Sequence, residues 1–185
     1  MVILAPGDRG LAHDPAPTLI ARTFVQAGLR VARFDAPPSD DHQAARDEAI
    51  AACIRRAASE VRPAQTLVVG GLSRGARVSA SMSEALGASG LVLFAYPFHP
   101  RRDTDCGDRV TQLARLTLPV WLGQGTRDTH GNQQQVRGYR LPAHIQVHWL
   151  QGANHALVPR PRSGQSQAGQ LALAAAEAAA FILAL

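Results

Sequence analysis

Ten residues near the middle of the chain decide the fold prediction: Thr66-Leu67-Val68-Val69-Gly70-Gly71-Leu72-Ser73-Arg74-Gly75. The apolar run at 66–69 is typical of a buried strand, and we expect the glycine pair to break it. A helical pattern follows from about 74 to 86. Between them lies a Gly-x-Ser-x-Gly sequence, in which the serine occupies a strained turn and the flanking glycines let backbones pass closely. The stretch therefore predicts a strand, a sharp turn and a helix, with the Ser73 hydroxyl raised above a sheet.

Strand and helix patterns alternate along the rest of the chain. Short apolar runs predict further strands at 2–5, 29–34, 91–96, 119–122 and 145–150. Apolar residues at helical spacing predict helices at about 14–28, 40–61, 110–116 and 167–185. Most strands are apolar throughout, which is typical of a parallel sheet covered on both faces. We predict an α/β fold with a mostly parallel sheet of about six strands, flanked by helices on both faces.

The composition narrows the class of protein. The chain has 185 residues, of which 46% are hydrophobic and 18% charged, which excludes a disordered protein. This length suits a single domain over 1–185, with a short loop or lid at 97–109. No stretch is long enough for a signal peptide or a membrane span. Two cysteines, Cys53 and Cys106, cannot form a multi-bridge framework, and no Cys-x-x-Cys pair indicates zinc. We expect a soluble, cytoplasmic protein.

A catalytic serine needs a base, and the base needs an acid that orients it. In such sheets ligands bind at the carboxyl ends of the strands, so residues just after each strand are the candidates. Asp128 follows the run at 119–122, and His155 follows the run at 145–150. We predict that Ser73 attacks a carbonyl carbon, that His155 relays the proton and that Asp128 orients the imidazole. The order serine, acid, histidine along the chain is the one expected on this architecture.

Other interpretations of these residues remain open. Ser73 could cap a helix, and Asp128 could belong to a turn or a helix cap. The other candidate acids are Asp103, Asp105 and Asp108, and the one rival nucleophile is Cys106. Among the remaining histidines, His42 and His144 are expected at the surface, His148 inside a strand and His130 in a turn before a helix.

The oxyanion that forms during acyl transfer needs backbone N–H donors. One is expected from Arg74, directly after Ser73, and the other from Gly7 or Asp8 in the loop after the first strand. The same loop carries Arg9, which we expect to line the substrate pocket. The fourth strand exits through Tyr96-Pro97-Phe98-His99-Pro100, so Tyr96, Phe98 and His99 are the other expected pocket residues, with a rigid strand exit as the alternative.

The charge pattern bears on the substrate. There are 19 basic residues against 14 acidic ones, and every basic residue is arginine. A basic excess favours nucleic acid, a membrane surface or an anionic substrate. No run of basic residues interleaved with aromatic ones appears, so we expect no nucleic-acid or membrane partner. Several arginines fall in loops that should surround the site, namely Arg9, Arg74, Arg101, Arg102 and Arg127. Since arginine binds carboxylates with paired N–H groups, an anionic ester is the expected substrate.

Taken together, these residues resemble the α/β-hydrolase superfamily, and within it the small dienelactone-hydrolase-like members. The resemblance rests on the serine turn at 70–77, the Tyr-Pro-Phe-His-Pro stretch at 96–100, the Gly7 loop, Asp128 and His155, and so covers most of the chain. It implies a sheet that lacks the first two antiparallel strands of larger members. It also implies a Ser-His-Asp hydrolase that needs no metal or other cofactor. From the ordered triad at three strand ends and the short 97–109 loop, we expect it to cleave a small carboxylic ester or thioester.

One departure from the resemblance lies in the first loop, which reads Pro6-Gly7 where His-Gly is frequent. The backbone donor survives this change, but any role of the histidine side chain is lost. Some relatives in the subgroup are not enzymes, and a shared fold does not fix function. A catalytically silent interaction protein with the hydrolase fold is therefore the alternative hypothesis.

Overall fold

The computed structural model describes residues 1–9, 14–35, 42–101 and 107–185. Six strands form one sheet in the order β2-β1-β3-β4-β5-β6, and every neighbouring pair is parallel. The strands are β1 (Val2–Ala5), β2 (Val31–Arg33), β3 (Val68–Leu72), β4 (Gly90–Phe94), β5 (Val120–Gly125) and β6 (Ile145–Leu150). The predicted α/β fold with a six-stranded sheet is confirmed.

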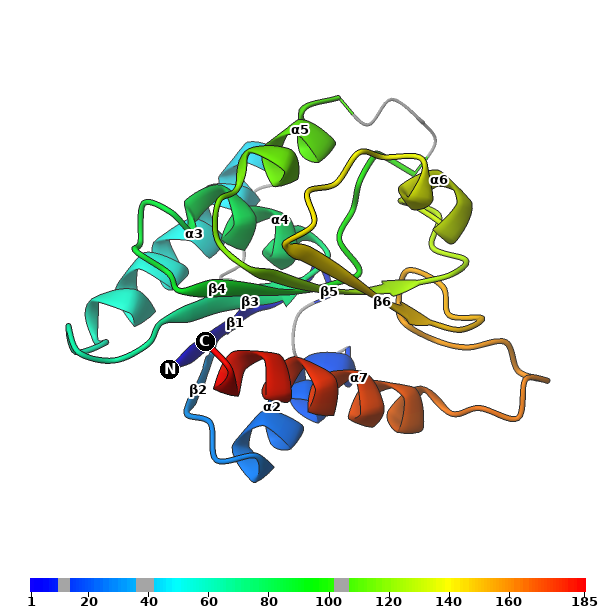
Figure 1. The fold of residues 1–185 in the computed structure, drawn as a ribbon, viewed down its shortest axis with the longest axis horizontal. Coiled ribbons are helices and arrows are strands. Elements are labelled where there is room, and N and C mark those ends of the chain that lie inside the picture. Colours follow the sequence, from blue (N-terminus) through cyan, green and yellow to red (C-terminus); the bar gives the residue numbers. More distant parts are fainter. Residues whose placement is uncertain (10–13, 36–41, 102–106) are drawn as a thin grey trace.

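Helices cover both faces of the sheet (Figure 1). They are α2 (Ala16–Gln26), α3 (Gln43–Ser59), α4 (Arg74–Met82), α5 (Gly107–Arg115), α6 (Gln133–Arg137) and α7 (Gln167–Leu183). On one face lie α2 and α7, and on the other lie α3, α4 and α5. No helix among the described residues is long and apolar enough to span a membrane.

Alternation along the strands builds one apolar core on each face. Val2 and Leu4 belong to the core beneath α2 and α7, whereas Ile3 and Ala5 belong to the core beneath α3 and α4. This division follows from the two-residue period of a strand, which sends successive side chains to opposite faces. Because both faces are covered, the inner strands β1, β3 and β4 are apolar throughout, as the sequence pattern indicated for most strands.

The strand order places the site. From β1 the chain leads through α2 to β2 on one side, and from β3 it leads through α4 to β4 on the other. Because α2 and α4 lie on opposite faces, the loops after β1 and β3 diverge. Open α/β sheets bind ligands in the crevice that such a reversal creates at the carboxyl ends of the strands.

The prediction that the glycine pair at 70–71 breaks the third strand is wrong, because β3 continues through Leu72. At Gly70 an added Cβ would lie 2.1 Å from the carbonyl oxygen of Val92 on β4. These glycines are therefore needed inside the sheet, where a neighbouring backbone approaches too closely for a side chain.

One further boundary differs from prediction. Helix α5 begins at Gly107, so the predicted loop or lid at 97–109 ends earlier than expected. Residues 102–106 of this predicted loop, which include Arg102, Asp103, Asp105 and Cys106, lie outside the described residues. The expected start of the long helix at 39–40 also lies outside them.

Candidate active site

Ser73 occupies a sharp turn between β3 and α4. Its backbone has φ 49° and ψ −114°, a positive-φ conformation that costs a non-glycine residue energy. The backbone N–H of Ser73 donates to the carbonyl oxygen of Phe94 at 2.9 Å, which ties the turn to β4. The loop after β1 packs directly against this turn, because an added Cβ on Gly75 would lie 2.4 Å from the carbonyl oxygen of Pro6. The motif's glycine is thus required by a close backbone approach.

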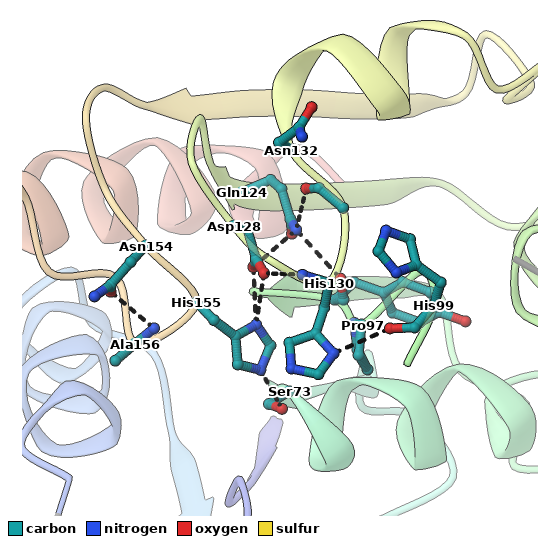
Figure 2. Close-up of polar contacts among 12 residues, drawn as sticks. Ser73, Pro97, His99, Gln124, Asp128, His130, Asn132, Asn154, His155 and Ala156 are labelled. Atoms are coloured by element: carbon teal, nitrogen blue, oxygen red, sulfur yellow. Dashed lines mark hydrogen bonds and ion pairs between the residues drawn. The ribbon is translucent and has the colours of Figure 1, made fainter. Parts of the chain in front are cut away.

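Three side chains from separate loops form a continuous chain of hydrogen bonds (Figure 2). Ser73 Oγ lies 2.8 Å from His155 Nε2, and His155 Nδ1 lies 2.8 Å and 3.0 Å from the two carboxylate oxygens of Asp128. Asp128 is 1% exposed and lies in the loop after β5, and His155 lies in the loop after β6. Since a carboxylate can only accept, Nδ1 carries the proton, which leaves Nε2 free to accept from the serine hydroxyl.

The loop that carries His155 is held by Asn154. Its side-chain oxygen accepts the backbone N–H groups of Ala156 and Val158 at 3.0 Å and 3.1 Å. Leu157 within this loop has a positive φ of 57°. Local hydrogen bonds to an asparagine side chain stabilise such a tight turn and thereby fix the position of the imidazole.

The buried Asp128 carboxylate has two further donors. Gln124 Nε2 donates to Oδ2 at 3.0 Å, and the backbone N–H of His130 donates to Oδ1 at 2.7 Å. Gln124 is fully buried within β5 and also lies within hydrogen-bond distance of the Tyr96 and Gly131 carbonyl oxygens. Sequence reasoning missed Gln124. Its signal was a glutamine in an otherwise apolar strand, since a buried amide needs partners.

A second histidine packs against the first. The rings of His130 and His155 have centroids 4.2 Å apart and are tilted by 45°. His130 Nδ1 lies 3.0 Å from the carbonyl oxygen of His99, so Nδ1 donates and Nε2 is left as an acceptor in the neutral form. Burial and the neighbouring His155 lower the pKa of His130, so its ring stays neutral beside His155. A neutral neighbour does not oppose the charge that His155 acquires as a base.

A cavity of about 340 Å³ opens onto Ser73 and His155. Four residues expected at the site from sequence, Gly7, Asp8, Arg9 and Arg74, line it. At Gly7 an added Cβ would lie 3.5 Å from Ser73 Cβ, so the first loop lies directly beside the serine. The N–H of Arg74 opens α4, where backbone donors have no partner within the helix.

The expectation that Tyr96, Phe98 and His99 line the pocket is wrong. Tyr96 and Phe98 are fully buried and His99 is 3% exposed, and none of the three lines the cavity. Ala95 has a positive φ of 49°, which interrupts the extended chain after β4. The two aromatic rings pack edge to face with centroids 5.1 Å apart, inside the core beneath α4 and α5. Large apolar rings gain more free energy in the core than at a wet cavity wall.

Of the arginines expected around the site, Arg9, Arg74 and Arg101 line the cavity, whereas Arg127 lies elsewhere. The Arg74 guanidinium pairs with Asp8 and with Asp47, the latter at 3.0 Å. Arg127 donates to the Gly152 carbonyl oxygen at 3.0 Å and lines a separate surface hollow. Arg101 lines the cavity as expected, and sequence reasoning missed two further lining arginines, Arg77 and Arg109.

A parallel sheet of this order, with a strained serine after β3 and a histidine and buried aspartate in later loops, defines the α/β-hydrolase class of fold. The chain belongs to the alpha/beta hydrolase domain family, which matches residues 1–183. This membership supports hydrolase activity. No curated protein matches the sequence.

Solved structures share the fold at low sequence identity. A serine hydrolase without a lid from Xanthomonas campestris is 24% identical, with a TM-score of 0.63 over 84% of this chain and 73% of that one. The esterase domain of a Rhodothermus marinus protein is 16% identical, with a TM-score of 0.67 over 97% and 85%. Est1E from Butyrivibrio proteoclasticus is 12% identical, with a TM-score of 0.75 over 100% and 88%. At these identities the likeness shows the fold alone.

Proposed function

We propose that the protein is a serine hydrolase that cleaves a small carboxylic ester or thioester through an acyl-enzyme. The observation that carries the proposal is the hydrogen-bond chain from Ser73 Oγ through His155 to Asp128, which opens onto a cavity. A nucleophile, a base and an orienting acid, each 2.8 Å from the next, form the arrangement that acyl transfer needs.

In the acylation step, Ser73 Oγ bonds to the carbonyl carbon while His155 Nε2 takes the hydroxyl proton. The tetrahedral intermediate then expels the alcohol or thiol, which receives that proton from His155. In deacylation, water attacks the acyl carbon by the same route, releases the carboxylic acid and restores Ser73. The Asp128 carboxylate holds the imidazole in the required tautomer and stabilises its positive charge in both steps.

The oxyanion is expected to accept hydrogen bonds from the N–H of Arg74 and from that of Gly7 or Asp8. The close packing of Gly7 against Ser73 supports this pair of donors. Removing a single donor of this kind costs about 10²- to 10³-fold in kcat in serine hydrolases. The Pro6-Gly7 sequence keeps such a donor because the group involved belongs to the backbone.

The cavity supports a small substrate. Its volume of about 340 Å³ lies at the lower end of the range for small-molecule sites. We also propose that the chain belongs to the dienelactone-hydrolase-like subgroup, whose members it resembles at the serine turn. We further propose that the protein is cytoplasmic, a location in which a free thiol such as that of Cys53 stays reduced.

Labelling with a fluorophosphonate probe tests the nucleophile. We expect the wild type and Ser81→Ala, which removes an exposed serine of α4, to be labelled, and Ser73→Ala to remain unlabelled. Equal labelling of Ser73→Ala and the wild type would refute the proposal. A panel of p-nitrophenyl esters and acyl-CoA thioesters, with Ser73→Ala as the control, then identifies the scissile bond.

The alternative of a catalytically silent interaction protein makes a different geometric prediction. It is favoured by a serine–imidazole separation well beyond about 3.5 Å, which no side-chain rotation could close. The separation of 2.8 Å between Ser73 Oγ and His155 Nε2 instead supports catalysis.

A further inference from the structure

The cavity wall carries more positive than negative charge. Within the described part of the chain, the charged lining residues are five arginines and two aspartates: Arg9, Arg74, Arg77, Arg101, Arg109, Asp8 and Asp14. A third aspartate, Asp47 on α3, does not line the cavity but pairs with both Arg74 and Arg77. Even with Asp47 counted, the wall keeps an excess of positive charge.

The carboxylates are unevenly shared among these arginines. Asp8 and Asp47 both bind Arg74, and Asp47 also binds Arg77. Asp14 accepts the backbone N–H of Ala16 at 3.0 Å, at the start of α2. Among the described residues, none of these aspartates forms an ion pair with Arg109.

Arg109 is a half-buried cation that donates a hydrogen bond to a neutral group. Its Nη1 donates to the carbonyl oxygen of Pro97 at 3.0 Å. Burial and the nearby Arg77 lower the pKa of Arg109, so its charge is disfavoured by both desolvation and a like charge. A guanidinium has five N–H donors in a rigid fork, and this bond uses one of them. An anion in the cavity would relieve the repulsion and accept from further donors of the fork.

Arg109 is also held in place before any ligand arrives. The buried Tyr96 hydroxyl lies 3.1 Å from the Arg109 carbonyl oxygen and 3.2 Å from Gln112 Oε1, both acceptors on α5. The next residue along the strand exit, Pro97, supplies the carbonyl that binds the guanidinium. The 96–97 segment therefore fixes both the backbone and the side chain of Arg109, which lowers the entropy that binding would cost.

We propose that Arg109, with Arg77 beside it, binds a carboxylate on the substrate, so that the preferred substrate is an ester or thioester that carries a second, ionised carboxyl group. This inference rests on the proposed function and names its substrate class. A carboxylate suits the site because its two oxygens match the parallel N–H groups of a guanidinium edge.

Matched ester pairs test the inference. The mono-p-nitrophenyl esters of glutarate and adipate are each compared with the neutral analogue in which –CONH₂ replaces –COO⁻. Butyrate esters of 4-hydroxybenzoate and 4-hydroxybenzamide test a carboxylate on the leaving-group side. Rates without protein are subtracted, because a neighbouring carboxylate accelerates spontaneous hydrolysis. The measured quantity is the ratio of kcat/KM for the charged ester to that for its neutral partner.

We expect this ratio to be about 10 to 100 in the wild type in at least one series, the size of a charge-assisted hydrogen-bond pair. Arg109→Gln should bring the ratio close to 1, and Arg109→Lys should restore part of it. Arg115→Gln is the matched control, since it removes the same charge from α5 outside the cavity and should leave the ratio unchanged. Raising the salt from about 0.05 to about 0.5 M should reduce the wild-type ratio, because the site is open to solvent.

The outcomes separate the two proposals. If neutral esters are cleaved with Ser73 dependence but the ratio is near 1 in every series, the carboxylate inference is wrong and the hydrolase proposal stands. The carboxylate inference is also wrong if Arg109→Gln leaves a high ratio unchanged. If no ester or thioester is cleaved, the hydrolase proposal fails. The substrate class then fails with it, and the carboxylate-binding role of Arg109 is decided by melting temperatures with glutarate and with glutaramide. A rise with glutarate alone, lost in Arg109→Gln, supports that role, and no rise overturns it.

Discussion

Replacing Asp128 by asparagine isolates the role of one negative charge with almost no change in shape. Both carboxylate oxygens face donors only: Oδ1 accepts from His130 N–H, Oδ2 accepts from Gln124 Nε2, and His155 Nδ1 lies against both. The NH₂ of an asparagine must replace one of these oxygens and therefore meet a donor. The least costly response is for His155 to shift its proton to Nε2, which can then no longer accept from Ser73.

The structure indicates how far kcat should fall in Asp128→Asn. During catalysis His155 becomes positive beside a carboxylate that is 1% exposed. Two unit charges about 4 Å apart attract by about 4 kcal/mol at an effective dielectric constant of about 20. Losing that attraction in the transition state costs about 10³-fold in rate, since each tenfold corresponds to about 1.4 kcal/mol. The unfavourable tautomer adds to this, so we expect kcat to fall by about 10³- to 10⁴-fold.

The assay is hydrolysis of p-nitrophenyl butyrate, with circular dichroism to verify that each variant folds. Asp108→Asn is the control, because it makes the same chemical change at an exposed position in the first turn of α5. The control should retain wild-type kcat. A folded Asp128→Asn protein whose kcat falls by less than about 30-fold would contradict the role assigned to Asp128, because the loss of charge alone should cost more.

Three further predictions follow from other contacts. Gly75→Ala would place a Cβ 2.4 Å from the Pro6 carbonyl oxygen, so we expect it to destabilise the fold by about 2–4 kcal/mol and to abolish activity, as measured by urea unfolding and ester hydrolysis. Tyr96→Phe removes a buried hydroxyl donor and should lower the free energy of unfolding by about 1–2 kcal/mol, while decreasing the preference for charged esters. The pKa of His130 is lowered from 6.5 by burial and by His155, so its stabilising contribution is complete above about pH 6.5 and is lost as the pH falls toward the folded-state pKa. Urea midpoints at about pH 7.5 and about pH 5.5 should therefore differ less in His130→Phe than in the wild type.

Each of these predictions has its own control. At Gly138 the nearest atom to an added Cβ lies 3.2 Å away, so Gly138→Ala should cost much less than Gly75→Ala. Tyr139→Phe is the control for Tyr96→Phe, and we expect it to leave the preference for charged esters unchanged. An unchanged pH dependence in His130→Phe would show that another group titrates.

The linear pattern predicted the architecture because that architecture depends on local signals. Apolar runs of strand length alternate with segments that have apolar residues at helical spacing. A parallel sheet with helices on each face buries the apolar strands and the apolar faces of the helices together. The serine turn was predictable for the same reason, since its conformation is set by neighbours within a few residues. The end of β3 was not predictable from the sequence. Gly70 lies inside the strand because the carbonyl of Val92 on β4 approaches it closely, and that contact exists only in the folded sheet.

The amino-acid sequence by itself determined the strand–turn–helix at Ser73, the candidate acid at Asp128 and the candidate base at His155, because each follows a recognisable strand. Tertiary structure decided how these side chains meet and what surrounds them. Tyr96 and Phe98 face the core because burial of an aromatic ring outweighs any local preference. Arg109 faces the cavity because packed elements bring it beside residues far apart in the chain. Gln124 contacts Asp128, four residues later, because the chain turns sharply after β5. Whether a given arginine has an aspartate as its ion-pair partner depends on the distance between them in the folded protein, which the sequence alone does not give.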